Sequence, residues 1–284
     1  MPLRDGKTAA ARDANRGPVY FVGGAPRSGT TVTHALLCTS ALVNRQHPEI
    51  SYVTPLVRSY TLGLKSWDMH THAFFASKEV FRQHIGDLLS QTLVQISDAL
   101  GAPEILCLKD PMLTPHFSSL RALLGERARF VTVVRNPFDV LRSRQEVARK
   151  ANQDFTPGMA QKICAEYMQM YRHMDHPAFG DSLMHLRYED LLSDGVLKNL
   201  RDFTGCDDIS PENIWGDTSQ ETMQRALKKA EQKAGQAAVD PWFSPKYHGA
   251  IDLSRRLPPL GQTYRDVVNG VCAPLMKRFD YPAP

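Results

Sequence analysis

Short hydrophobic runs alternate along this chain with longer segments in which apolar residues recur every three or four positions. The short runs, which are rich in β-branched and aromatic residues, predict buried strands at 19–22, 104–108, 129–134 and 183–187. The periodic segments predict helices at 77–100, 115–124, 137–150, 157–174, 191–203 and 263–279, with a further one beginning at Thr30. Because strands alternate with helices, we predict an α/β fold of three layers, with a central parallel sheet between helices.

Residues 207–262 interrupt this alternation. The charged stretch 219–234 predicts a solvated helix, whereas 240–262 holds four prolines and is typical of a loop. Connections of this length in compact domains are often functional or disordered. Residues 50–76 also lack a clear period, so we expect both regions to be irregular.

Composition places few limits on function. The chain has 284 residues, 42% hydrophobic and 23% charged, which is ordinary for a globular enzyme. The formal net charge of +4 suits anionic ligands but is too weak to indicate nucleic-acid binding. The sequence has no apolar run of membrane-spanning length, so we expect no stable membrane insertion. Composition indicates no oligomeric state.

The N-terminal residues are polar and lack the apolar core of a signal peptide. We therefore expect a flexible tail at 1–17 and a single domain at 18–284. The five cysteines are scattered, with no C-x-x-C pair, which favours reduced and mostly buried thiols in a cytoplasmic protein.

A glycine-containing loop follows the first predicted strand and leads into the next helix. Its spacing, Gly24-x-x-x-x-Gly29-Thr30-Thr31, is that of a phosphate-binding loop. Thr30 occupies the position where a nucleotide triphosphatase has the Lys that contacts the β- and γ-phosphates, which argues against ATP or GTP hydrolysis. Arg27 supplies a cation at a different position in the loop. The loop therefore predicts phosphate binding, but not binding of a triphosphate.

Two further cations follow predicted strands. Lys109 comes directly after the second strand and Arg135 directly after the third, with Ser143 two turns into the following helix. Ligands of open α/β sheets bind beyond the carboxyl ends of the strands, where these two residues would meet Arg27. Three cations at one edge are costly unless an anion with several charges lies among them.

Four motifs together resemble a known family. P-R-S-G-T-T at 26–31 and V-V-R-N-P-x-D-x-x-x-S at 133–143 are similar to the sulfotransferases that use 3′-phosphoadenosine 5′-phosphosulfate. K-D-P at 109–111 is similar to the tyrosylprotein sulfotransferases, and L-R-Y-E-D-L at 186–191 is similar to the R-Y-E-x-L stretch of the family. The motifs follow the family's order and are closest to its tyrosylprotein and carbohydrate branch.

The resemblance implies a P-loop-like site for this co-substrate. The first loop would hold the 5′-phosphosulfate, while Arg and Ser of the second motif would hold the 3′-phosphate and the Tyr would lie against the nucleotide. The residues assigned in this way are Arg27, Ser28, Gly29, Thr30, Thr31, Arg135, Ser143, Tyr188 and, in a late loop, Ser254. Where the family has a second Arg beyond the Ser, this chain has Val147.

The resemblance also implies a catalytic base that takes the proton of an acceptor hydroxyl. Glu49 lies near the offset of the base in the tyrosylprotein branch, and His47 is the alternative. Another branch has K-T-H where this chain has Asp110 and Pro111, which favours Glu49. Lys109 and Arg27 would stabilise the sulfuryl oxygens, and no metal is expected.

The sequence thus predicts a sulfotransferase that moves a sulfuryl group from 3′-phosphoadenosine 5′-phosphosulfate to an acceptor hydroxyl. A saccharide or glycolipid is the first candidate acceptor, and a tyrosine or small phenol the second. We expect 50–76 and 207–262 to shape the acceptor pocket. A P-loop nucleotide or small-molecule kinase remains the alternative enzyme, and a nucleotide-binding regulator without turnover remains the non-enzymatic alternative.

Overall fold

The protein is built on a parallel sheet of four strands in the order β2-β1-β3-β4. A computed structural model describes residues 17–214, 253 and 258–282. The strands are β1 (Val19–Gly24), β2 (Leu106–Lys109), β3 (Ala128–Val134) and β4 (Leu183–Arg187). All four lie where the hydrophobic runs predict them, and the predicted parallel α/β sheet is confirmed.

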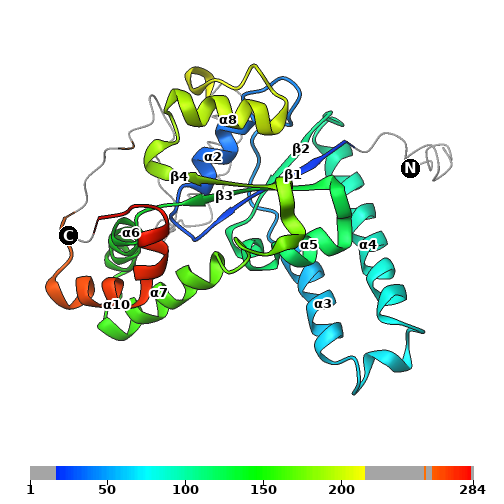
Figure 1. The fold of residues 1–284 in the computed structure, drawn as a ribbon, viewed down its shortest axis with the longest axis horizontal. Coiled ribbons are helices and arrows are strands. Elements are labelled where there is room, and N and C mark those ends of the chain that lie inside the picture. The colour runs from blue at the N-terminus through cyan, green and yellow to red at the C-terminus, as the bar shows by residue number, and fades with distance from the viewer. Residues whose placement is uncertain (1–16, 215–252, 254–257, 283–284) are drawn as a thin grey trace, which may run out of the picture.

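Helices cover both faces of the sheet (Figure 1). On one face, α3 (Val53–Lys65), α4 (Lys78–Ala99) and α5 (Phe117–Leu124) enclose one core with alternate residues of the strands. On the other face, α2 (Thr30–Leu37) and α8 (Asp194–Thr204) enclose a second core. A third core joins α6 (Pro137–Lys150), α7 (Pro157–Met170) and α10 (Gln262–Arg278) beside the carboxyl end of β3. This arrangement confirms the predicted three layers.

One expectation is wrong: the segment 50–76 is not irregular throughout, because it contains α3. Val53, Val57 and Tyr60 recur on one face of this helix and are buried in the core. Pro55 lies in the first turn, where no backbone donor is required. Gly63 lets Phe81 of α4 approach, since a Cβ there would lie 2.3 Å from the Phe81 ring. Both residues resemble loop signals in the sequence but are compatible with this helix.

Three helix boundaries differ from the predicted ones by more than one residue. A 3₁₀ turn, Pro111–His116, precedes α5, which begins at Phe117 instead of residue 115. A similar turn, Tyr188–Asp190, follows β4, so α8 begins at Asp194 and is capped by Ser193, whose side chain accepts from the Val196 amide. Helix α7 ends at Met170, four residues earlier than predicted.

Some expectations lie outside the described residues. These are the tail at 1–16, the charged helix at 219–234 and most of the loop at 240–262. Among the helices that the structure describes, none has the length and apolar character required to cross a membrane.

Candidate active site at the carboxyl ends of the strands

The loop between β1 and α2 has the backbone of an anion-binding loop. Gly29 directly precedes α2 and has φ +100°, and Gly24 at the end of β1 has φ +144°. A Cβ on Gly29 would lie 2.2 Å from Cδ2 of Tyr188, so only glycine fits against this ring. Arg27 has φ +77°, which is uncommon for a residue with a side chain. The first backbone amides of α2 have no hydrogen-bond acceptor within the helix. They point out of its N-terminal end, which attracts anions.

Side chains from two other elements hold this loop in place. The Gly24 amide donates to Oγ1 of Thr114 over 2.8 Å. The Ala25 amide donates to the hydroxyl of Tyr171 over 3.0 Å, and that hydroxyl donates to the Val133 carbonyl over 2.8 Å. Burial raises the pKa of Tyr171, which keeps its hydroxyl protonated. Sequence analysis missed Thr114 and Tyr171, which lie in no motif.

The structure brings together four of the predicted phosphate and nucleotide residues. Nε of Arg27 donates to Oγ of the buried Ser143 over 2.9 Å, which joins the loop to α6. Nη1 of Arg135 donates to the Arg27 carbonyl over 3.2 Å, and its guanidinium lies 4.4 Å from the centre of the Tyr188 ring. Nε of Arg135 is buried and has no hydrogen-bond partner in the described part of the chain. An incoming anion would find an unused donor here.

Glu189 positions the start of α6, a role that the sequence did not indicate. Its Oε1 accepts from the Asn136 amide over 2.9 Å, and its Oε2 accepts from the Tyr281 hydroxyl over 2.7 Å. The contact joins the residue after Tyr188 to the residue after Arg135. The Y-E pair after β4 therefore supports the Arg135 site from two sides.

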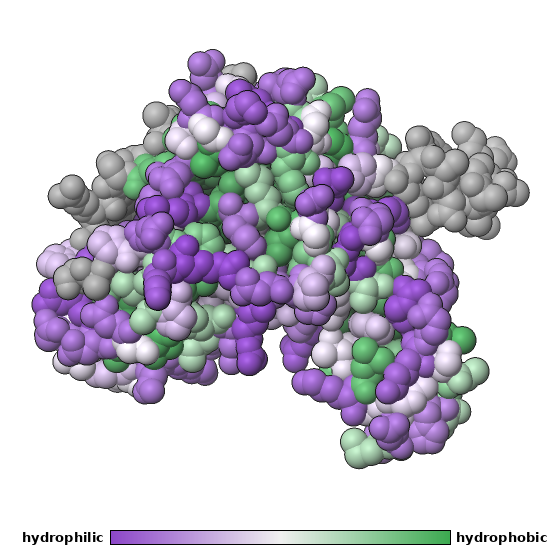
Figure 2. Space-filling view, viewed as in Figure 1, coloured by the Kyte–Doolittle hydropathy of each residue, from purple (hydrophilic) through white to green (hydrophobic). Residues whose placement is uncertain are grey.

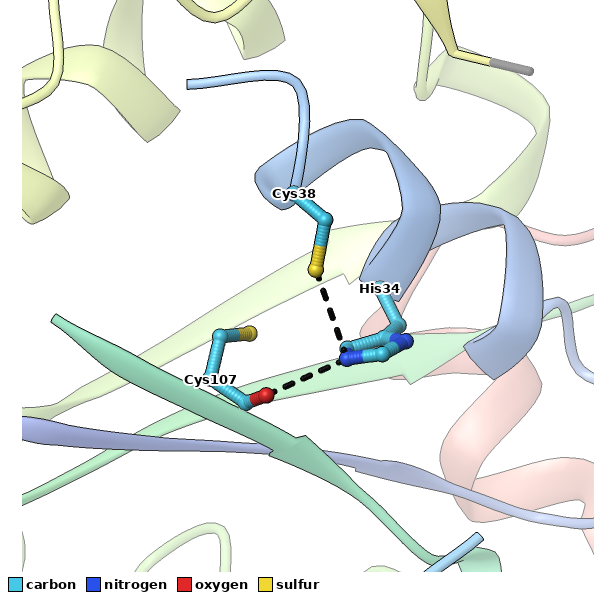
Figure 3. Close-up of side chains that lie close together, drawn as sticks. All are labelled: His34, Cys38 and Cys107. Carbon is cyan, nitrogen blue, oxygen red and sulfur yellow. Dashed lines mark hydrogen bonds between the residues drawn. The ribbon is translucent and has the colours of Figure 1, made fainter. Parts of the chain in front are cut away.

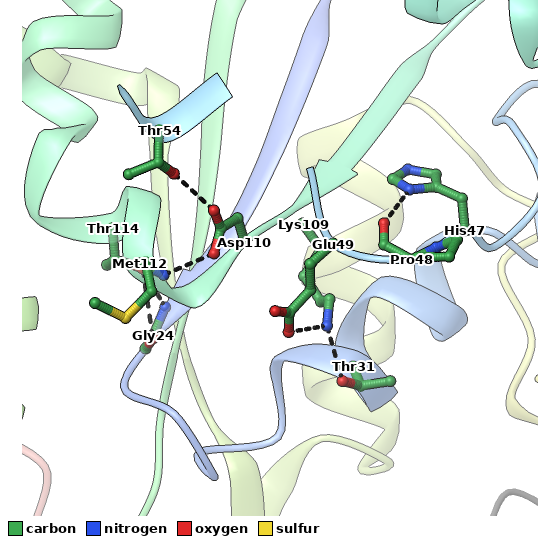
Figure 4. Close-up of polar contacts among 10 residues, drawn as sticks. All are labelled: Gly24, Thr31, His47, Pro48, Glu49, Thr54, Lys109, Asp110, Met112 and Thr114. Atoms are coloured by element: carbon green, nitrogen blue, oxygen red, sulfur yellow. Dashed lines mark hydrogen bonds and ion pairs between the residues drawn. The ribbon is translucent and has the colours of Figure 1, made fainter. Parts of the chain in front are cut away.

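Lys109 and Glu49 form an ion pair beside the loop (Figure 4). Nζ of Lys109 donates to Oε1 of Glu49 over 2.7 Å and to Oγ1 of Thr31 over 3.1 Å. The Lys109 side chain is 6% exposed, whereas that of Glu49 is 45% exposed. A buried ammonium requires an anionic partner, which Glu49 supplies. Because Glu49 is partly exposed, its carboxylate remains accessible to a ligand.

Asp110 ties α3 to the end of β2. Its Oδ2 accepts from Oγ1 of Thr54 over 2.6 Å, and its Oδ1 accepts from the Met112 amide over 2.9 Å (Figure 4). The Ile50 amide also donates to the Lys109 carbonyl over 3.2 Å. Burial raises the pKa of Asp110. These contacts fix the segment that carries Glu49 against the strand that carries Lys109.

His47 lies near this pair, and each of its ring nitrogens lies beside a carbonyl oxygen, to only one of which the neutral ring can donate. Nδ1 lies 2.6 Å from the Pro48 carbonyl and Nε2 lies 3.0 Å from the Cys107 carbonyl. Burial lowers the pKa of His47, which favours the neutral ring. To accept a proton from a ligand, a nitrogen would have to leave one of these carbonyls.

The arrangement has the chemistry of an anion site next to a base. Arg27 and Arg135 lie on one side of the loop, and Lys109, compensated by Glu49, lies on the other. Such a site can hold a ligand with several negative charges and present it to a carboxylate. Ser28 and Thr30 are buried in the loop. Ser254 lies outside the described residues.

Comparisons with known proteins identify a family and a fold. A profile of the sulfotransferase family matches residues 18–211. A sulfotransferase domain from the curacin biosynthetic pathway is 19% identical with a TM-score of 0.54, and the match covers 94% of this chain and 99% of that chain. Sulfotransferase STF9 from Mycobacterium avium is 16% identical with a TM-score of 0.53, covering 96% of this chain and 79% of that chain. These structures share the fold, and no curated protein sequence matches.

Proposed function

Because the chain belongs to the sulfotransferase family, we propose that it transfers a sulfuryl group from 3′-phosphoadenosine 5′-phosphosulfate to an acceptor hydroxyl. The acceptor oxygen bonds to sulfur while the bond from sulfur to the 5′-phosphate oxygen breaks, and adenosine 3′,5′-bisphosphate is released. The observation that carries the proposal is the convergence of Arg27, Lys109 and Arg135 around one loop, with Glu49 2.7 Å from Lys109.

The donor would be held at both of its phosphate ends. We assign the 5′-phosphate to the amides of Ser28, Gly29, Thr30 and Thr31, at the N-terminus of α2. We assign the 3′-phosphate to Arg135 and Ser143, which share contacts with Arg27. Tyr188, already beside the Arg135 guanidinium, offers its ring to the nucleotide. The unused Nε of Arg135 supports the fit of an additional phosphate. Ser254 remains a predicted contact.

Transfer of this kind depends on positioning and on neutralising charge on oxygen. Lys109 and Arg27 supply the cations for the sulfuryl oxygens and the departing phosphate. Lys109 also holds Oε1 of Glu49, so we assign uptake of the acceptor proton to Oε2. Glu49 is preferred to His47 because both nitrogens of His47 already contact carbonyl oxygens.

For the acceptor we propose a saccharide or glycolipid first, and a tyrosine or small phenol second. Tyr52, which directly precedes α3, and Met112, whose amide donates to Asp110, are 62% and 54% exposed. Exposed apolar side chains close to a reaction site favour an acceptor with an apolar portion. This supports a glycolipid within the first class and a phenol within the second.

The proposal is tested by incubating the purified protein with the sulfated donor and panels of saccharides, glycolipids, phenols and tyrosine peptides. Release of adenosine 3′,5′-bisphosphate, together with a product heavier by one sulfuryl group, is the expected result. Consumption of ATP with phosphorylated product would instead identify a kinase, and nucleotide binding without turnover of either donor would identify a regulator. Cell fractionation would test the predicted cytoplasmic location separately.

A further inference from the structure

Three potential metal ligands lie together between α2 and β2, apart from the groups assigned to the reaction. His34 and Cys38 are one turn apart on α2 and just after it, and Cys107 lies on β2 (Figure 3). The imidazole nitrogen and the two sulfur atoms all lie within 4.8 Å of one another, and Nε2 of His34 lies 3.4 Å from Sγ of Cys38. We propose that this group binds a thiophilic metal ion, Zn²⁺ or Cu⁺.

The spacing of the three atoms suits such an ion. Three points that lie within 4.8 Å of one another share a position no farther than about 2.8 Å from each. Zinc requires about 2.3 Å to sulfur and about 2.0 Å to imidazole nitrogen. Side-chain shifts of less than about 1 Å would therefore complete the coordination, leaving a fourth position for solvent.

His34 can change its partner without leaving a carbonyl unsatisfied. Its Nε2 lies 3.2 Å from the Cys107 carbonyl, which also accepts from Nδ2 of Asn44 over 3.1 Å and lies 3.0 Å from Nε2 of His47. A carbonyl oxygen has two lone pairs, so one of these three contacts is in excess. Nδ1 of the fully buried His34 has no partner among the described residues. The hydrogen bonding of the His34 ring is therefore incomplete, because Nδ1 has no partner among the described residues.

The ligand set selects soft ions. Two sulfurs and one nitrogen suit Zn²⁺ and Cu⁺, whereas Mg²⁺ and Ca²⁺ require oxygen ligands. Coordination converts the thiols of Cys38 and Cys107 to thiolates and releases both protons to solvent. Two thiolates neutralise a divalent ion, whereas a Cu⁺ site with the same ligands would keep one negative charge. Cys38, at the end of α2, is partly exposed, whereas His34 and Cys107 are buried.

Metal binding would add a link between two elements of the fold. An ion held by α2 and β2 would join the helix that carries Thr31 to the strand that carries Lys109, whose side chains are already in contact. We assign it a structural role, because none of the three ligand side chains belongs to the groups assigned to the donor or to the proton transfer. The proposal does not rest on sulfuryl transfer, and the two can fail separately.

The test uses reduced, metal-free, full-length protein. Titration with Co²⁺, as a spectroscopic substitute for Zn²⁺, should give a thiolate-to-cobalt charge-transfer band that saturates at one equivalent and disappears when Zn²⁺ is added. Cu⁺, delivered from a competing chelator, forms the second arm and distinguishes the two ions by affinity. Zn²⁺ or Cu⁺ should raise the unfolding temperature, whereas Mg²⁺ should not.

Cys38→Ala should abolish the band and the thermal shift, while Cys206→Ala should retain both. Cys206 is a buried cysteine that lies outside the group of three ligands, so it is the matched control. X-ray absorption of the zinc-loaded wild-type protein should show two sulfur neighbours, which decides the matter even where a variant does not fold. Binding that is unchanged in a folded Cys38→Ala, or a reduced wild-type protein that binds neither ion, would overturn the proposal. So would a protein that forms a Cys38–Cys107 disulfide in air but binds no metal after reduction.

Discussion

At the scale of single residues, Lys109 has two partners that belong to opposite sides of the proposed reaction. Thr31 lies at the loop that would hold the donor, and Glu49 is the proposed base for the acceptor. One ammonium therefore fixes the position of the carboxylate relative to the loop. Replacing Glu49 should therefore impair the transfer step. Replacing Arg135, on the other side of the loop, should instead impair binding of the nucleotide.

Glu49→Gln should lower kcat about 10²- to 10⁴-fold, because the amide keeps the shape of the side chain but cannot take the acceptor proton. Binding of adenosine 3′,5′-bisphosphate should not weaken, because Lys109 loses its ion-pair partner but stays available to the 5′-phosphate of this ligand. His47→Gln is the control and should retain most of the activity. Turnover measured with an identified acceptor, beside calorimetry with the bisphosphate, provides both readouts; a larger loss for His47→Gln would reassign the base.

Arg135→Ala should weaken binding of adenosine 3′,5′-bisphosphate about 10- to 100-fold, the cost of one or two charge-assisted hydrogen bonds. Binding of ADP should change little, because ADP has no 3′-phosphate. Arg129→Ala, on β3 and beside Phe203, is the matched control, because its guanidinium lies away from the loop. Equal losses for the two ligands in calorimetry would show that Arg135 holds the loop and not the 3′-phosphate.

At the scale of elements, the entry into α2 depends on the ring of Tyr188. Gly29→Ala brings a methyl group to about 2.2 Å from that ring in a left-handed backbone, whereas Gly205, with φ +71°, has open space around it. We expect Gly205→Ala to lower the free energy of unfolding by about 1 kcal/mol and Gly29→Ala by roughly 2–4 kcal/mol, with loss of bisphosphate binding. Urea unfolding and calorimetry measure both; identical stabilities with intact binding would contradict the role of Tyr188.

The link between α3 and β2 gives a further prediction. Thr54→Val removes the hydrogen bond to Oδ2 of the buried Asp110, which should cost about 1–3 kcal/mol of stability and lower kcat while bisphosphate binding is retained. Thr54→Ser keeps the hydroxyl and should restore both properties. Chemical unfolding and steady-state kinetics test this. If Thr54→Val retained full kcat, the link would not position Glu49.

Some elements of the fold could be predicted from the sequence, and others could not. Strand cores and most helices could be predicted, because their apolar periods match the faces that they bury. Helix α3 could not, since Pro55 and Gly63 are loop signals whose effects are absorbed by the first turn and by Phe81. Within the site, local motifs indicated Arg27, Arg135 and Lys109. Motifs did not indicate Tyr171 or Thr114, because the hydrogen bonds that place them join residues 146 and 90 positions apart.

At the scale of the whole molecule, different cores support the two sides of the proposed site. The core of α3, α4 and α5 supports the Glu49 side, and the core of α6, α7 and α10 supports the Arg135 side. The space-filling view shows polar side chains along the hollow between the two lower parts of the molecule (Figure 2). The site thus depends on the integrity of the entire fold.

Acid should weaken that fold. Burial lowers the pKa of His173 and His185 to about 4. Since both would titrate near 6.5 when unfolded, the unfolded chain binds more protons between these values, and stability falls as pH falls from about 6.5 towards 4. Between pH 7 and 5 we expect a loss of about 1–2 kcal/mol per histidine. Urea unfolding across this range should show a shallower slope for His185→Gln than for the wild type or for His70→Asn, at an exposed position. Equal slopes in all three would contradict the assignment.

Calorimetric titration of the wild-type protein with adenosine 3′,5′-bisphosphate, ADP and ATP tests the central claim most directly. The anion loop lacks a Lys at position 30 and lies beside Arg135 and Ser143, so it should favour a ligand with a 3′-phosphate over one with a γ-phosphate. The bisphosphate should bind at least about tenfold more tightly than ADP, and ATP no more tightly than ADP. Equal binding of all three ligands, or tighter binding of ATP, would contradict the assignment of this protein as a sulfotransferase that uses 3′-phosphoadenosine 5′-phosphosulfate.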